Sequence, residues 1–360
     1  MPAFIDSEYL AIEEVSMFIC LSSGSRRQYR DDIFRTLALP PGALIQFRYD
    51  KQYLSNAVTA NVNTQTFFGE EALIVFVDQF DSSKDPEFVP CRYATVQKIE
   101  EHGTTVSIEL LVDDFALAED LEAFSGWLRE SLSPDIPIST ASKIVGKYFL
   151  GTTKFPSGLK RTSQLCDWEK IVCQIALRQD FHDSNCFFAL RELKQGSDLI
   201  SASKGVFSLK SGRNCELRLY HYHPSTFTEK VSLKIAMTDG ISVSMLSNPT
   251  IPIDSRYDQK YIRFHIAQSP TNQYGFLTIS RESDQEIQWL FDLPIKIEGR
   301  FLLSLCYTIG VAILLAGPQI FAVWLNSSIT AERAVSATLI SVVCAILAGA
   351  FAVFGLKKAW

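Results

Sequence analysis

The chain has 360 residues, 47% of them hydrophobic, and a formal net charge of −6 at pH 7, so it can hold two domains and a further segment. Its acidic balance and the lack of a long basic run exclude a protein that binds nucleic acids broadly through surface charge. The eight cysteines contain no CxxC pair, so a zinc ribbon is not expected either.

The pattern of residues 1–140 predicts an α+β domain. We expect this domain to bind a ligand and act as the sensor. The pattern predicts an apolar strand at 15–21 and a helix at 26–37, whose apolar residues recur on one face. A second helix is expected from Leu117 onward. Further strands, in a mainly antiparallel sheet, are expected at 43–49, 72–80, 91–99 and 104–112.

The turn between the first strand and the first helix combines hydroxyl groups, a glycine and guanidinium groups. Such side chains, together with the free amides at the start of a helix, suit a phosphate or another anion. The expected anion-binding residues are Ser22, Ser23, Gly24, Ser25, Arg26, Arg27 and Arg30. The alternative is an ordinary turn followed by a solvated basic helix face.

Cys20 and Arg26 also fit the spacing C-x5-R after an apolar strand. This short motif resembles the phosphate loop of cysteine-dependent phosphatases. The resemblance implies a thiolate that attacks phosphorus and an arginine that holds the phosphate oxygens. Arg27 stands where that family usually has Ser or Thr, and the region does not follow a parallel βαβ pattern. The main expectation is a protein without catalytic residues, cofactor or metal, and a phosphatase-like enzyme is one alternative.

A loosely patterned stretch at 141–165 predicts a linker. From 166 to 298 the chain reads as short strands separated by turns, beginning with a strand at 171–177, which predicts an all-β sandwich of immunoglobulin-like or similar type. His221 and His223 share one face of an expected strand. No third ligand lies nearby in sequence, so surface or hydrogen-bonded histidines are the interpretation.

Residues 299–360 contain two long uncharged runs, at 301–325 and 334–356. About 20 apolar residues suffice to cross a bilayer as a helix, so the runs predict a two-helix transmembrane hairpin. Basic residues flank the pair, which places both termini in the cytoplasm. Small residues at regular spacing, and one proline, predict close helix assembly in lipid. The expected assembly residues are Ser304, Thr308, Ala312, Ala316, Pro318, Ala337, Ser341, Ala345 and Gly349.

These expectations together describe a membrane-anchored cytoplasmic sensor whose two helices assemble to act on the membrane. The layout is similar to that of membrane effectors of prokaryotic defence and signalling systems. The expected partners are the lipid bilayer, further copies of the chain, and an anionic or nucleotide ligand. A membrane-tethered adaptor that binds a protein partner is the alternative function.

Overall fold

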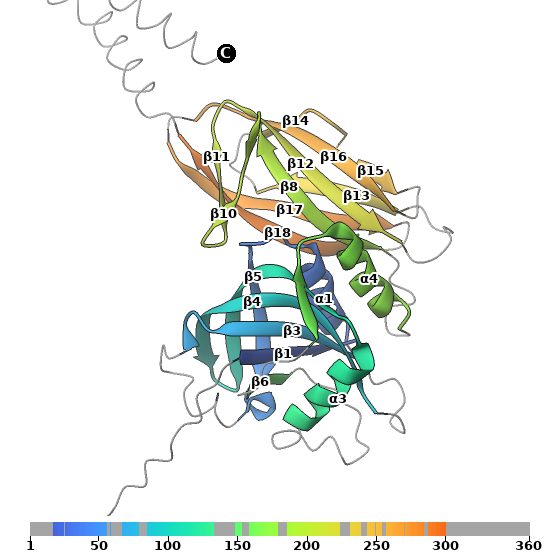
Figure 1. The fold of residues 1–360 in the computed structure, drawn as a ribbon. Helices are drawn as coiled ribbons and strands as arrows, with labels where there is room; N and C mark the ends of the chain where they lie inside the picture. The colour runs from blue at the N-terminus through green and yellow to red at the C-terminus, as the bar shows by residue number, and fades with distance from the viewer. Residues whose placement is uncertain are drawn as a thin grey trace, which may run out of the picture.

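Strands dominate the part of the chain that the structure describes, arranged in three sheets with three α-helices beside them (Figure 1). The computed structural model describes residues 17–24, 26–55, 58, 67–78, 85–132, 148–152, 158–178, 186–223, 231–238, 243–248, 250–253, 257–269, 271–283 and 287–299.

The first sheet is formed by the N-terminal half of the chain. Its strands are β1 (Met17–Ser23), β2 (Leu44–Asp50), β3 (Glu71–Asp78), β4 (Glu87–His102), β5 (Thr105–Ala118), β6 (Tyr148–Thr152) and β7 (Leu159–Thr162). The strand order is β2-β5-β4-β3-β1-β6, and β7 pairs with β5. β1 and β3 run parallel, and the other pairs are antiparallel. β2 therefore forms one edge of the sheet.

The helices are amphipathic and cover both faces of the first sheet. They are α1 (Arg27–Ala38), α3 (Leu121–Leu132) and α4 (Leu165–Ala176). α1 and α4 share one buried cluster, in which Leu37 of α1 packs with Trp168 of α4 and Phe76 of β3. α3 buries Phe124 and Leu128 in a separate cluster. A short 3-10 helix, η1 (Lys51–Tyr53), follows β2.

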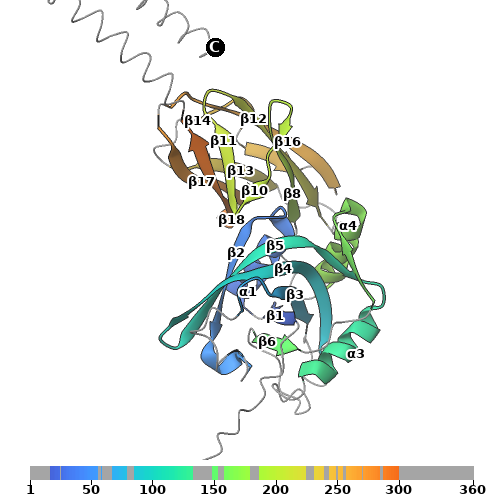
Figure 2. The same cartoon turned by 60° about the vertical axis from the view of Figure 1, so that its left-hand side comes forward.

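The remaining strands form two sheets that face each other beyond the first one (Figures 1 and 2). The six-stranded sheet contains β10 (Ala202–Ser203), β11 (Val206–Lys210), β18 (Ile287–Glu298), β17 (Gln273–Ser283), β13 (Val231–Met237) and β15 (Thr250–Ile253), in that order. The five-stranded sheet contains β14 (Val243–Met245), β16 (Tyr257–Ile266), β12 (Asn214–Tyr222), β8 (Phe187–Gln195) and β9 (Asp198–Leu199). Apolar residues at alternate positions of both sheets are buried between them, as period-2 patterning requires.

The first sheet and the facing pair share a continuous core. One buried cluster contains Ile45 and Val106 of the first sheet together with Leu217 and Leu293 of the other two. Ala43 forms a parallel bridge with Gly205 at this junction. Gly205 has a φ of +78°, and a Cβ there would lie 2.2 Å from Cγ of Leu44, so only glycine fits.

The expected α+β class is wrong, because most of the described chain is strand. Two of the extra strands, β6 and β7, come from the stretch 141–165 that was expected to be a linker. Conversely, the first strand expected in the sandwich, 171–177, is largely part of α4. Its buried residues Trp168, Ile171, Val172 and Ile175 recur with helical spacing.

The prediction of a transmembrane hairpin and of an integral membrane protein with cytoplasmic termini also needs correction. The two runs, 301–325 and 334–356, and the assembly residues between Ser304 and Gly349 lie outside the described residues. In the part that the structure describes, no helix is long and apolar enough to cross a bilayer. Each of its α-helices has 12 residues, which span about 18 Å, short of the bilayer core of about 30 Å.

Candidate functional site

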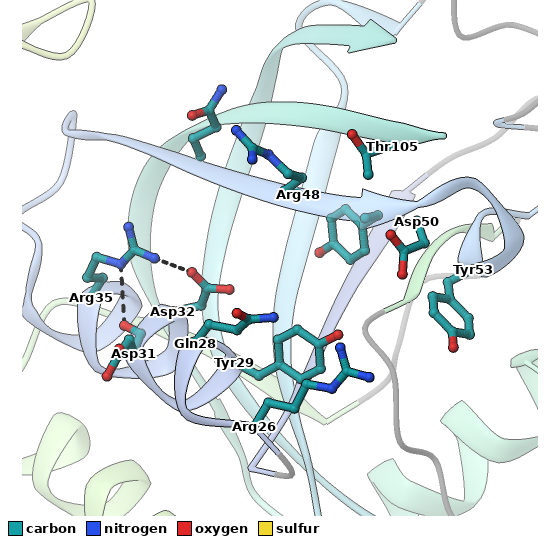
Figure 3. Close-up of a pocket in the computed structure, with 12 residues that line it drawn as sticks. Arg26, Gln28, Tyr29, Asp31, Asp32, Arg35, Arg48, Asp50, Tyr53 and Thr105 are labelled. Carbon is teal, nitrogen blue, oxygen red and sulfur yellow. Dashed lines mark hydrogen bonds and ion pairs between the residues drawn. The ribbon is translucent and has the colours of Figure 1, made fainter. Parts of the chain in front are cut away.

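A hollow of about 450 Å³ lies between α1 and the edge strand β2. Figure 3 shows side chains of α1 on one wall and side chains of β2 on the other. The lining residues are Arg26, Gln28, Tyr29, Asp31, Asp32, Arg35, Gln46, Arg48, Tyr49, Asp50, Tyr53 and Thr105. Ligand-binding sites are concave and contain a few convergent polar groups within a mainly apolar lining. This hollow is concave, but most of its lining is charged or polar.

Local interactions at the end of β1 fix where α1 begins. Ser22 donates a hydrogen bond from Oγ to the carbonyl of Tyr29 at 3.1 Å. Arg26 is the N-cap residue in an extended conformation, and its carbonyl accepts from the amides of Tyr29 and Arg30 at 3.0 and 3.1 Å. The side chain of Arg26 makes no capping bond. The helix start is thus held against β1 while the Arg26 guanidinium is left at the hollow.

The alternation of β2 supplies the opposite wall. Ile45, Phe47 and Tyr49 are buried, and Gln46, Arg48 and Asp50 between them are exposed. This period-2 pattern places Arg48 and Asp50 on the same face of the strand. Tyr53 of η1 and Thr105 of β5 complete the wall at the end of the strand.

Arg35 is the arginine of the hollow whose charge is already neutralised. Its guanidinium forms an ion pair with the buried carboxylate of Asp32, and its Nε donates to the carbonyl of Asp31 at 3.4 Å (Figure 3). Burial lowers the pKa of Arg35, while the charges of Asp31 and of Asp292 on β18 partly oppose that change. Arg35 therefore serves the packing of α1.

Arg26 and Arg48 are in a different situation. The Arg26 guanidinium lies over the ring of Tyr29, 5.5 Å from its centroid. Within the described residues, neither Arg26 nor Arg48 forms an ion pair or a side-chain hydrogen bond with another group. The hollow is thus lined by two arginines, Arg26 at the start of α1 and Arg48 on β2, whose donors are not used by the described residues.

The residues expected to bind an anion are spread over several environments. Ser22, Ser23 and Gly24 are buried, and Ser25 lies outside the described residues. Arg27 is exposed and Arg30 is half-buried, and neither lines the hollow. Arg26 is the residue of that set that lines it. The structure adds Arg48, Asp50 and Tyr53, which the sequence interpretation did not include.

Cys20 does not have the environment of a nucleophile. It lies fully buried on β1, in the same cluster as Tyr49. Burial raises the pKa of the Cys20 thiol well above its usual value, and a hydrogen bond with Tyr49 opposes this only in part. A nucleophilic cysteine needs a lowered pKa, because the thiolate is the reactive form. The arrangement gives no support to the phosphatase-like alternative.

The histidines do not assemble a metal site in the described part of the chain. His221 and His223 are both buried. Among the described residues, no group of three or more His, Cys, Asp or Glu side chains could hold a metal ion.

The C-terminal end of α1 is fixed by two buried side chains. Nη1 of the fully buried Arg92 donates to the carbonyls of Thr36, at 2.9 Å, and of Leu39, and its Nε donates to that of Asp113 at 2.6 Å. Nε1 of Trp168 donates to the carbonyl of Leu37 at 3.1 Å. The last carbonyls of a helix lack partners within the helix. These bonds satisfy them and hold the C-terminal end of α1, the helix that forms one wall of the hollow, in place.

Comparisons with known proteins add no functional assignment. No family model matches the chain, and no curated protein matches it. A solved structure of the VesB protease of Vibrio cholerae is similar over 72% of this chain and 96% of that chain, with 8% sequence identity and a TM-score of 0.21. A likeness at that TM-score supports no conclusion about fold or function.

Proposed function

We propose that this protein binds a ligand without chemically changing it, and that the hollow between α1 and β2 is the binding site. The ligand carries an anionic group. The observation that supports this is that Arg26 and Arg48 both line the hollow without forming an ion pair with any described residue, while Arg35 in the same hollow is paired with Asp32.

The chemistry of the walls favours recognition over catalysis. Guanidinium groups bind carboxylates and phosphates through several directed hydrogen bonds. Each hydrogen bond to a charged group is worth about 1.5–3 kcal/mol. Tyr29 and Tyr53 add aromatic surface, and Gln28 adds an amide. The proposal therefore includes the ligand binding and the anionic ligand that were expected from the sequence.

Binding of two simple anions tests this proposal. Inorganic phosphate and N-acetyl-aspartate amide are titrated into the full-length protein, and binding is followed by NMR of the small molecule. The double variant Arg26→Gln/Arg48→Gln is expected to weaken binding by at least about tenfold, because it removes one or two charge-assisted hydrogen bonds.

The matched control is Arg27→Gln, which removes an exposed arginine from the same helix turn outside the hollow. It is expected to leave binding unchanged. If neither anion binds the wild-type protein, or if the double variant binds as the wild type does, the proposal is wrong.

A further inference from the structure

We infer that the ligand of this hollow is an extended peptide segment that adds as a strand to the open edge of β2. The inference rests on the proposed function and gives its ligand a chemical class. It follows from the direction of the backbone groups of β2, from the hollow beside them and from the charges on the strand.

The backbone direction is fixed by bonds at the two ends of β2. The amide of Val112 donates to the carbonyl of Ala43 at 2.9 Å, and the amide of Lys51 donates to the carbonyl of Thr104 at 3.0 Å. Between these bonds the register is regular, from Leu44 opposite Leu111 to Asp50 opposite Thr105. In an antiparallel pair, only alternate residues bond to the neighbouring strand. The odd-numbered residues of β2 therefore face β5.

The backbone N–H and C=O groups of Leu44, Gln46, Arg48 and Asp50 consequently point away from β5. β2 ends the strand order, and none of the described strands pairs along this side of it. The side chains of Gln46, Arg48 and Asp50 line the hollow. The hollow thus borders a row of backbone donors and acceptors, which is what an added strand requires.

The junction with the facing sheets already uses the start of this edge. Ala43 makes its parallel bridge with Gly205 there. Beyond it, residues 46–50 form an open stretch of about 17 Å at 3.4 Å per residue. That length suits an extended peptide of about five residues.

The charges on the edge define the side chains that such a peptide carries. Arg48 and Asp50 lie two positions apart on one face of β2. Opposite charges on directly opposed residues stabilise a strand pair, and like charges destabilise it. The preferred peptide therefore has an acidic residue opposite Arg48 and a basic residue two positions away, opposite Asp50. The acidic side chain is the anionic group of the proposed function.

Selection followed by chemical modification tests the inference. The immobilised full-length protein is offered a displayed library of random peptides of about nine residues, long enough to cover the open edge. The library is expected to yield sequences with an acidic and a basic residue two positions apart. The best peptide is then synthesised in two forms. One carries N-methyl groups on its odd-numbered amides, and the other carries them on its even-numbered amides.

One N-methylated form is expected to lose about tenfold or more in affinity, and the other to bind nearly as the parent does, because only alternate amides of an added strand bond to β2. Equal affinity of the two forms contradicts an added strand. A library without enriched peptides also contradicts it, and means that the charged residues of the edge only prevent association.

A matched pair of protein variants separates this inference from the proposed function. Gln46→Pro removes an edge N–H that β5 does not use, a position at which proline is tolerated in strands. The ratio of peptide affinity to phosphate affinity is expected to be at least about tenfold lower in Gln46→Pro than in Gln46→Ala, which removes the same side chain but keeps the N–H. If phosphate binds and no peptide does, the peptide inference alone is wrong. If Gln46→Pro does not fold, the N-methylated peptides still decide the question.

Discussion

The two ends of α1 differ in how the rest of the protein uses their polar groups. At the C-terminal end, Arg92 and Trp168 occupy the carbonyls of Thr36, Leu37 and Leu39. At the N-terminal end, the Arg26 guanidinium lines the hollow and forms no ion pair with the described residues. The carbonyls at the first end are satisfied from within the protein, whereas the donors of Arg26 at the second end are not used by the part of the chain that the structure describes. The contrast separates an arginine that holds the fold together from one that is available to a ligand.

The starts of the other helices sharpen this contrast. Asp120 accepts hydrogen bonds from the amides of Glu122 and Ala123 at the start of α3, both at 3.0 Å. α4 carries Asp167 in its first turn. A carboxylate at the start of a helix satisfies free amides and the positive end of the helix dipole. α1 has no acidic residue in its first turn, so no carboxylate of that turn interacts with the positive end of its dipole.

The largest expected effect is at Arg92. The variant Arg92→Met leaves the carbonyls of Thr36, Leu39 and Asp113 without their buried donor, at a cost of about 1–3 kcal/mol for each group not rescued by water. We expect the free energy of unfolding to fall by about 3–5 kcal/mol in urea denaturation.

The comparison variant is Arg48→Met, which removes an arginine from the exposed side of β2. We expect it to change the free energy of unfolding by less than about 0.5 kcal/mol. If the two variants destabilise the protein equally, the distinction between a structural arginine and an available one is wrong.

A smaller effect is expected at Trp168. Trp168→Phe keeps an aromatic ring in the cluster between α1 and α4 but removes the donor to the carbonyl of Leu37. The unsatisfied carbonyl and the reduced ring volume should lower the free energy of unfolding by about 1–2 kcal/mol in urea denaturation. An unchanged value would show that this carbonyl finds another partner and that the end of α1 is less firmly fixed than described.

The smallest effect concerns the start of α4 and depends on pH. Hydrogen bonds from Lys160 at 2.7 Å, and from Lys170 and Thr162 at 2.9 Å, hold the pKa of Asp167 well below its usual value. A lowered pKa contributes stability above the unfolded value of about 3.9 and loses it as the pH falls below that value. Asp167→Asn should lower Tm by a few degrees near neutral pH, and thermal melting below about pH 3 should show a smaller difference. A difference that is independent of pH would assign the effect to packing.

Single elements could be predicted from local patterns, although the fold class could not. The strands expected at 91–99 and 104–112 correspond to β4 and β5, and the apolar spacing of 26–37 located α1. The hollow could not be found in this way, because β2 becomes an edge through the non-local strand order of the sheet. The sequence interpretation found Arg26 in a turn with other polar residues. Arg48 and Asp50 were not predicted as site residues, because the alternating pattern of a strand does not indicate whether the strand lies at the edge of a sheet or which element lies next to it.

The central claim is that Arg26 and Arg48 bind an anionic group and contribute little to folding. Parallel measurements on Arg26→Gln/Arg48→Gln test it most directly: the affinity for N-acetyl-aspartate amide and the free energy of unfolding in urea. We predict that the affinity falls by at least about tenfold, while the free energy of unfolding changes by less than about 1 kcal/mol. Unchanged affinity, or a loss of binding that only follows a loss of folding, would contradict the assignment of the hollow as a binding site.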